Sequence, residues 1–146
     1  MERAAALEQL MRWAGIPKTA RPERRMLNVC ELQALAKHPL ITIRAHTEAH
    51  ASLPSLPVEE QEREIRGSRE TLQKLMGNPI EFFAYPYGEY NATTIECVRR
   101  TGFRAAFTTR PEVVMPHAYP FTLPRRAGQN VGGDVFGPWL RRAFLT

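Results

Sequence analysis

The stretch LITIRAHTEAH, residues 40–50, places two histidines directly after a short apolar run. Its β-branched and apolar residues predict a β-strand over residues 40–44, so His46 and His50 fall in the loop that follows the strand. Imidazole is a common metal ligand. From spacing alone, the pair is either part of a metal site or two loop histidines without a role.

The elements around this stretch alternate between helix and strand. Asn28 and Glu31 form a capping-box pattern, Gly77 ends a long amphipathic helix, and Asn91 begins another. The patterns predict helices over residues 3–14, 29–37, 57–76, 91–100 and 134–144, and strands over 40–44, 80–84 and 103–108. Such alternation is typical of an α/β fold with a parallel sheet, whose functional residues gather beyond the carboxyl ends of the strands.

A second loop lies at the end of the next predicted strand. Residues 85–88 read YPYG and follow the apolar run 80–84. This turn could present a backbone N–H to an oxyanion and an aromatic ring to a sugar. A tight turn whose rings cap the core is the simpler interpretation of the loop taken alone.

The histidine pair does not make a complete catalytic metal site. Catalytic zinc takes three protein ligands and a water, and hydrolysis also needs a general base. Thr47, between the histidines, is expected to hydrogen-bond the local backbone and fix their turn. The acidic run at residues 59–64 is expected to be a solvated helix face.

Composition argues against several functional classes. The net charge of +5 comes from scattered arginines without interleaved stacking aromatics, so nucleic acid is not an expected partner. No apolar run reaches the roughly 18 residues that a membrane span needs. The first residues lack a signal-peptide pattern, so a cytoplasmic location is the default expectation.

Five segments in order resemble the polysaccharide deacetylases, the NodB-homology domain of carbohydrate esterase family 4. They are ITIRAHTEAHASLPSL, EEQEREIRGSRETLQKLMG, IEFFAYPYGEYN, VRRTGFRAAFTT and LPRR, within residues 26–126. The resemblance implies a distorted (β/α)7 barrel that hydrolyses N-acetyl groups of amino-sugar polymers or their lipid-linked precursors. It divides the chain into an N-terminal helix and connector, 1–25, and a partial deacetylase domain, 26–146.

The resemblance also assigns roles to residues. It implies that His46 and His50 bind a divalent metal, with zinc the expected ion, and that this metal activates the attacking water. Pro86 and Tyr87 become catalytic residues, because the Tyr87 backbone N–H would help bind the oxyanion. The substrate is an N-acetylated glycan, and its expected contacts are Tyr85, Tyr87 and Arg125.

Three departures from the family pattern stand out. Ala84 replaces a frequent arginine, and Arg44 replaces a usual glycine two residues before the first histidine. The Asp-Asp motif that should supply the base and third ligand is absent, since Asp134 is the chain's single aspartate. We therefore expect a partial barrel that lacks its first strands and is catalytically impaired alone.

Other residues are weak substitutes for the missing groups. The longer side chains of Glu48 and Glu89 would place their carboxylates wrongly for a metal ligand. His117 is the candidate general acid, although a loop histidine without a role is the simpler interpretation.

Three hypotheses follow for the chain as a whole. It is an N-terminally truncated deacetylase, a non-catalytic carbohydrate-binding remnant that uses Tyr85, Tyr87 and Tyr90, or a chain completed by an Asp-Asp segment from a second chain.

Overall fold

The computed structural model describes residues 2–16, 25–128 and 130–145. The chain divides into two compact units, Met1–Ala34 and Leu35–Thr146. Helix α1 (Glu2–Trp13) lies in the first unit, and α2 (Val29–Ala36) begins there. The predicted capping box is confirmed: the Asn28 side chain accepts the Glu31 N–H, and the Glu31 carboxylate accepts the Asn28 N–H, both at 2.9 Å.

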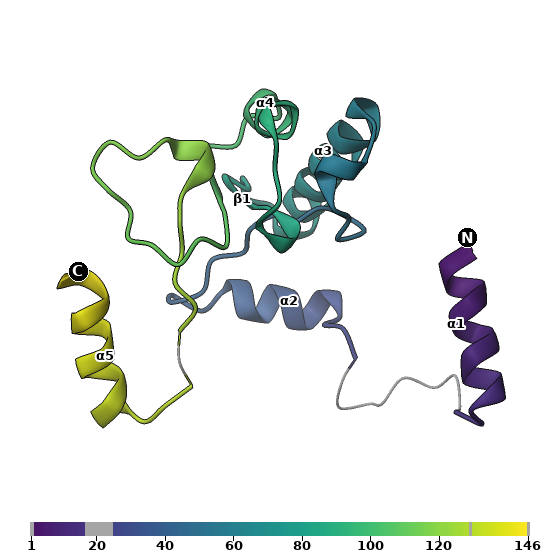
Figure 1. Cartoon of the computed structure of the whole chain (residues 1–146), viewed down its shortest axis with the longest axis horizontal. Helices are drawn as coiled ribbons and strands as arrows, with labels where there is room; N and C mark the ends of the chain where they lie inside the picture. Colours follow the sequence, from purple (N-terminus) through teal and green to yellow (C-terminus); the bar gives the residue numbers. More distant parts are fainter. Residues whose placement is uncertain (1, 17–24, 129, 146) are drawn as a thin grey trace. The chain divides into compact units, whose positions relative to one another are not determined.

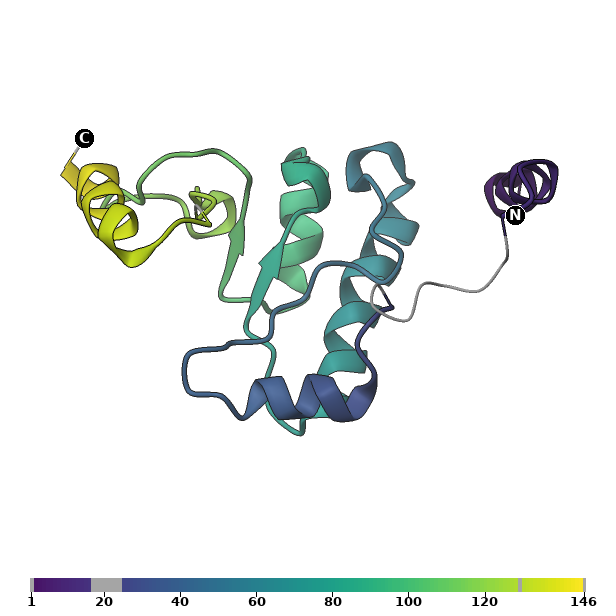
Figure 2. The same ribbon diagram turned by 90° about the horizontal axis from the view of Figure 1, so that it is seen from below.

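The second unit contains the sheet and the helices that pack on it. In order it holds α3 (Val58–Met76), β1 (Phe82–Ala84), α4 (Ala92–Arg100), β2 (Ala105–Phe107) and α5 (Gly133–Leu145). Helices α3 and α4 lie side by side (Figures 1 and 2). Gly77 ends α3 at φ 69°, and the Asn91 side chain caps α4 by accepting the Thr94 N–H, as the sequence predicts.

The sheet is parallel, as the alternation predicts. Strand β1 pairs with β2 in the register Phe82↔Ala105 to Ala84↔Phe107. One further residue pairs with the outer side of each strand: Ala45 with Phe83 of β1, and Leu123 with Phe107 of β2, both as single parallel bridges. The structure is therefore α/β with parallel strands.

The predicted strand over residues 40–44 is wrong. Only Ala45 pairs with β1, through its N–H to the Phe82 carbonyl at 3.1 Å and its carbonyl to the Ala84 N–H at 2.9 Å. Strand β1 begins at Phe82. Residues 40–43 therefore extend past the start of the neighbouring strand, where no ladder can form.

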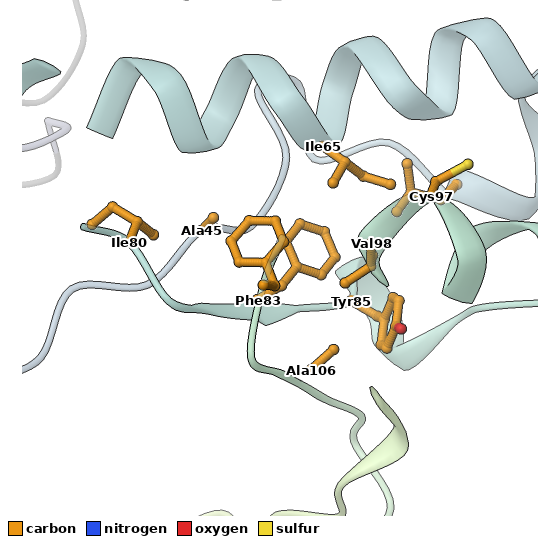
Figure 3. Packing of buried hydrophobic residues seen from close by; sticks show 10 residues of the cluster. Ala45, Ile65, Ile80, Phe83, Tyr85, Cys97, Val98 and Ala106 are labelled. Carbon is orange, nitrogen blue, oxygen red and sulfur yellow. The ribbon is translucent and has the colours of Figure 1, made fainter. Parts of the chain in front are cut away.

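The core lies between β1 and the two helices. Phe83 is fully buried, and its ring meets the Tyr85 ring edge-on at 5.4 Å between centroids. Ile65 of α3 and Val98 of α4 pack in the same cluster around it (Figure 3). This packing fixes the strand ends, and with them the two loops that carry the candidate site.

Candidate metal and substrate site

The histidine loop turns back on itself so that its two imidazoles meet. The His46 and His50 ring centroids are 4.7 Å apart, with their planes at 75°. Thr47 and His50 have positive φ angles of 63° and 54°. Such angles are uncommon outside glycine and gather at functional sites. The Thr47 hydroxyl donates to the His46 carbonyl at 2.5 Å, which confirms the local hydrogen bond predicted for this turn.

One hydrogen bond orients the first histidine. His46 Nδ1 lies 2.7 Å from the carbonyl oxygen of Ala84, the last residue of β1. Because a carbonyl only accepts, Nδ1 carries a proton, and in the neutral imidazole Nε2 is then the nitrogen with the lone pair. A backbone carbonyl on one ring nitrogen is how proteins usually fix a metal-binding imidazole. This contact leaves Nε2 as the ring nitrogen of His46 that could bind a metal.

Helix α3 holds the same loop from the other side. The Glu64 carboxylate accepts the backbone N–H groups of Glu48 and Ala49, at 2.9 and 2.8 Å. The prediction of a solvated acidic face over 59–64 is thus wrong at Glu64. It is also wrong at Gln61, which is buried and accepts a hydrogen bond from Thr94 of α4. The contact of Glu64 with the histidine loop was not predicted from the sequence, because helical periodicity does not reveal loop contacts.

The tyrosine loop lies against the second histidine. The Tyr87 ring is 4.7 Å from the His50 ring, at 80°, and the residue is 61% exposed. Tyr87 has φ 58°, and at Gly88 a Cβ would lie 2.1 Å from the Thr109 hydroxyl. This tight turn allows only glycine at position 88.

The turn leaves one backbone donor free. The N–H groups of Gly88 and Glu89 bond to the carbonyls of Tyr85 and Pro86, each at 3.0 Å. Within the described ranges, the Tyr87 N–H has no acceptor. Pro86, which is buried, fixes the start of the turn. The free N–H is the group that an oxyanion would need.

Tyr85 and Arg125, both predicted substrate contacts, are placed elsewhere. The Tyr85 side chain has no exposed surface, and its hydroxyl donates to the Phe121 carbonyl at 2.9 Å. Burial also raises the pKa of this phenol. A fully buried ring cannot stack on a sugar, so that prediction is wrong. Arg125 Nε donates to the Thr108 carbonyl at 2.9 Å, and no contact recorded for the described residues joins it to either histidine.

The nearby carboxylates do not complete a metal centre. The Glu48 carboxyl packs against Gly67 of α3, where a Cβ would meet it at 2.6 Å. Glu89 accepts a hydrogen bond from the Ser52 hydroxyl. Over the residues that the structure covers, no group of three or more histidine, cysteine, aspartate and glutamate side chains could hold a metal. His117 is exposed. The chain's described residues thus fit two ligand positions of a metal site.

The fold and the site together describe an α/β protein with a histidine pair and an aromatic turn beyond the ends of parallel strands. The family model for polysaccharide deacetylases matches residues 12–106, which include both loops. The chain therefore belongs to the polysaccharide deacetylase family, and the match begins upstream of residue 26. None of the described helices is long and apolar enough to cross a membrane.

Individual relatives agree with the family assignment. The protein YxkH of Bacillus subtilis (strain 168), named provisionally as a polysaccharide deacetylase, is 26% identical over 111 residues, which are 75% of this chain and 39% of YxkH. The polysaccharide deacetylase BC0361 of Bacillus cereus superposes with TM-score 0.64 at 23% identity, over 72% of this chain and 33% of BC0361. The Streptococcus pyogenes deacetylase PplD, solved in complex with acetate, gives 0.72 at 20% identity, over 84% and 52%. The chain thus spans about a third to a half of these relatives.

Proposed function

We propose that this chain is part of a metal-dependent hydrolase that removes N-acetyl groups from amino-sugar polysaccharides or glycan precursors. One observation carries the proposal: His46, His50 and Tyr87 come together from two loops far apart in sequence, with ring centroids 4.7 Å apart at each contact. Family membership adds the reaction class, hydrolysis of a non-peptide C–N bond in a glycan. Acetate, the ligand of PplD, is the acid product that this reaction would release.

The residues take the following roles. His46, through Nε2, and His50 would hold the divalent ion, for which zinc suits a histidine-containing site. When bound, this ion supplies Lewis-acid polarisation and a water of lowered pKa. The free Tyr87 N–H donates to the oxygen of the N-acetyl carbonyl as charge develops on it. The exposed Tyr87 ring offers a face to the sugar.

We infer that the third ligand and the base come from a further segment of the barrel, since the described residues do not supply them. Ala45 directs both backbone groups toward β1. In a parallel pair, the groups of the neighbouring residues point the other way, and the N–H groups of Arg44 and His46 have no recorded acceptor among the described residues. This free edge supports a partial (β/α)7-type barrel, completed by a preceding strand or by a segment of a second chain. Taken alone, the chain is then catalytically impaired.

The test measures acetate released from N-acetylglucosamine oligomers with zinc present. The chain alone should release little. Addition of a peptide segment that carries an Asp-Asp strand should restore release for the wild type and not for His46→Ala. Acetate release by the chain alone at the full rate would refute the impairment, and no release under any condition would count against the hydrolase.

The second candidate function is a non-catalytic carbohydrate-binding module. The 61% exposure of Tyr87 favours it, because that ring is available for stacking without any metal. Glycan binding that survives a chelator and His46→Ala, without acetate release, would select this alternative.

A further inference from the structure

Arg44 is a cation held by aromatic rings, and none of the described residues forms an ion pair with it. Its guanidinium carbon lies 4.2 Å from the Phe82 ring centroid and 5.5 Å from that of Phe107. Arg104 approaches the same Phe82 ring at 5.9 Å, but it is paired with Glu81 at 3.1 Å. In the described part of the chain, no carboxylate lies within ion-pair distance of Arg44. No ion pair with a described residue therefore neutralises its charge.

Arg44 faces the same side of the sheet as the first histidine. Side chains alternate between faces along extended backbone, and Ala45, between the two, is buried in the core. Arg44 and His46 also line one hollow of about 410 Å³, together with Thr47 and Glu48 of the histidine loop. The wall of this hollow on α3 is formed by Ser68, Thr71 and Leu72.

We propose that the site takes a glycan with an anionic substituent, a carboxylate or a phosphate, close to its N-acetyl group, and that Arg44 binds this anion. The inference rests on the hydrolase proposed above and names its substrate class. Stacking on Phe82 occupies a face of the guanidinium. Its N–H donors lie in the guanidinium plane, so they stay free for the paired oxygens of a carboxylate or phosphate.

The test compares three sugars by calorimetry at low salt, in the presence of zinc. N-acetylglucosamine is the neutral probe, N-acetylmuramic acid carries a carboxylate, and N-acetylglucosamine 6-phosphate carries a phosphate. We expect at least one anionic sugar to bind about tenfold or more tightly than the neutral one, with an advantage that shrinks as salt rises. The stronger of the two anions identifies the substituent.

The variants assign the effect to Arg44. R44M keeps an unbranched stem against Phe82 and removes the charge, so the anionic advantage should vanish while neutral binding persists. R44K keeps a positive charge but loses the paired N–H donors of the guanidinium, so it should retain part of the anionic advantage. R104M is the matched control, because Arg104 shares the Phe82 ring but already has Glu81 as its partner, and it should leave the advantage intact.

Three results would overturn the inference: equal binding of all three sugars, no binding of either anionic sugar, or an anionic advantage that R44M does not reduce. Equal, His46-dependent binding of the sugars would overturn it and leave the proposed hydrolase standing. Suppose instead that an anionic sugar binds through Arg44 but no acetate is released when the Asp-Asp segment is added. That result would support the inference and count against the hydrolase.

Discussion

The two faces of the short parallel sheet differ in how deeply their side chains are buried. On one face, Phe83 and Ala45 are fully buried beneath α3 and α4. On the other, Phe82 and Phe107 are half-buried and carry the guanidinium of Arg44. The first face is thus a closed core, whereas the second leaves its aromatic rings partly exposed. The candidate site is uneven in a similar way. The Tyr87 N–H is free to act as a donor, but the described residues hold no third metal ligand.

Alanine substitution on each face tests this comparison with the largest expected effect. Phe83→Ala should lower the free energy of unfolding by about 3–5 kcal/mol, because it opens a cavity in packed surroundings. Phe82→Ala, one residue away on the half-buried face, should cost about 1–2 kcal/mol. Urea denaturation measures both. Equal losses would show that the two faces are equally well packed.

Removal of the Glu64 charge sharpens the comparison at the histidine loop. Glu64→Gln replaces two charge-assisted hydrogen bonds to the Glu48 and Ala49 N–H groups. We expect zinc affinity to fall about tenfold or more, as for other residues that orient metal ligands. Glu70→Gln, exposed on the same helix, is the control for calorimetry. Unchanged affinity in Glu64→Gln would mean that the loop keeps its shape without α3.

The smallest expected effect concerns the buried tyrosine. Tyr85→Phe removes the hydroxyl donor to the Phe121 carbonyl and should cost about 1 kcal/mol of stability at neutral pH. Tyr119→Phe, at an exposed ring, is the control.

Burial of Tyr85 also predicts a pH dependence. Burial raises the pKa of Tyr85 in the folded chain above its unfolded value, which is about 10. The stabilisation from the neutral phenol is therefore full below about pH 10 and is lost as pH rises toward the folded-state pKa. Denaturation between pH 9 and 11 should show a shallower decline for Tyr85→Phe than for the wild type. Parallel declines would show that the ring is more hydrated than its burial indicates.

Local signals in the sequence predicted local structure correctly. The Asn28–Glu31 capping box, Gly77 at the end of α3 and Asn91 at the start of α4 each depend on residues three or four positions apart. Thr47 belongs with them, since its hydroxyl bonds to the adjacent carbonyl. Such contacts can be inferred from sequence because both partners lie in the same short window.

The errors concern contacts between distant segments. The run at 40–44 has strand-forming residues, but a strand needs a partner, and β1 begins only at Phe82. Glu64 bonds to a loop 15 and 16 residues away, and Tyr85 bonds to a carbonyl 36 residues away. Neither side chain's environment is encoded in its neighbours. For the same reason, the sequence alone does not predict that Tyr85 is buried and Tyr87, two residues later, is exposed.

Zinc binding by the histidine pair is the most direct test of the central claim. Calorimetry on the purified chain should detect zinc binding that His46→Ala and His50→Ala each abolish. His38→Ala should leave it unchanged, because His38 lies outside the loop and its Nδ1 accepts the Leu40 N–H at 3.2 Å. Zinc binding that survives both loop substitutions, or no binding by the wild type, would contradict the assignment of His46 and His50 as metal ligands.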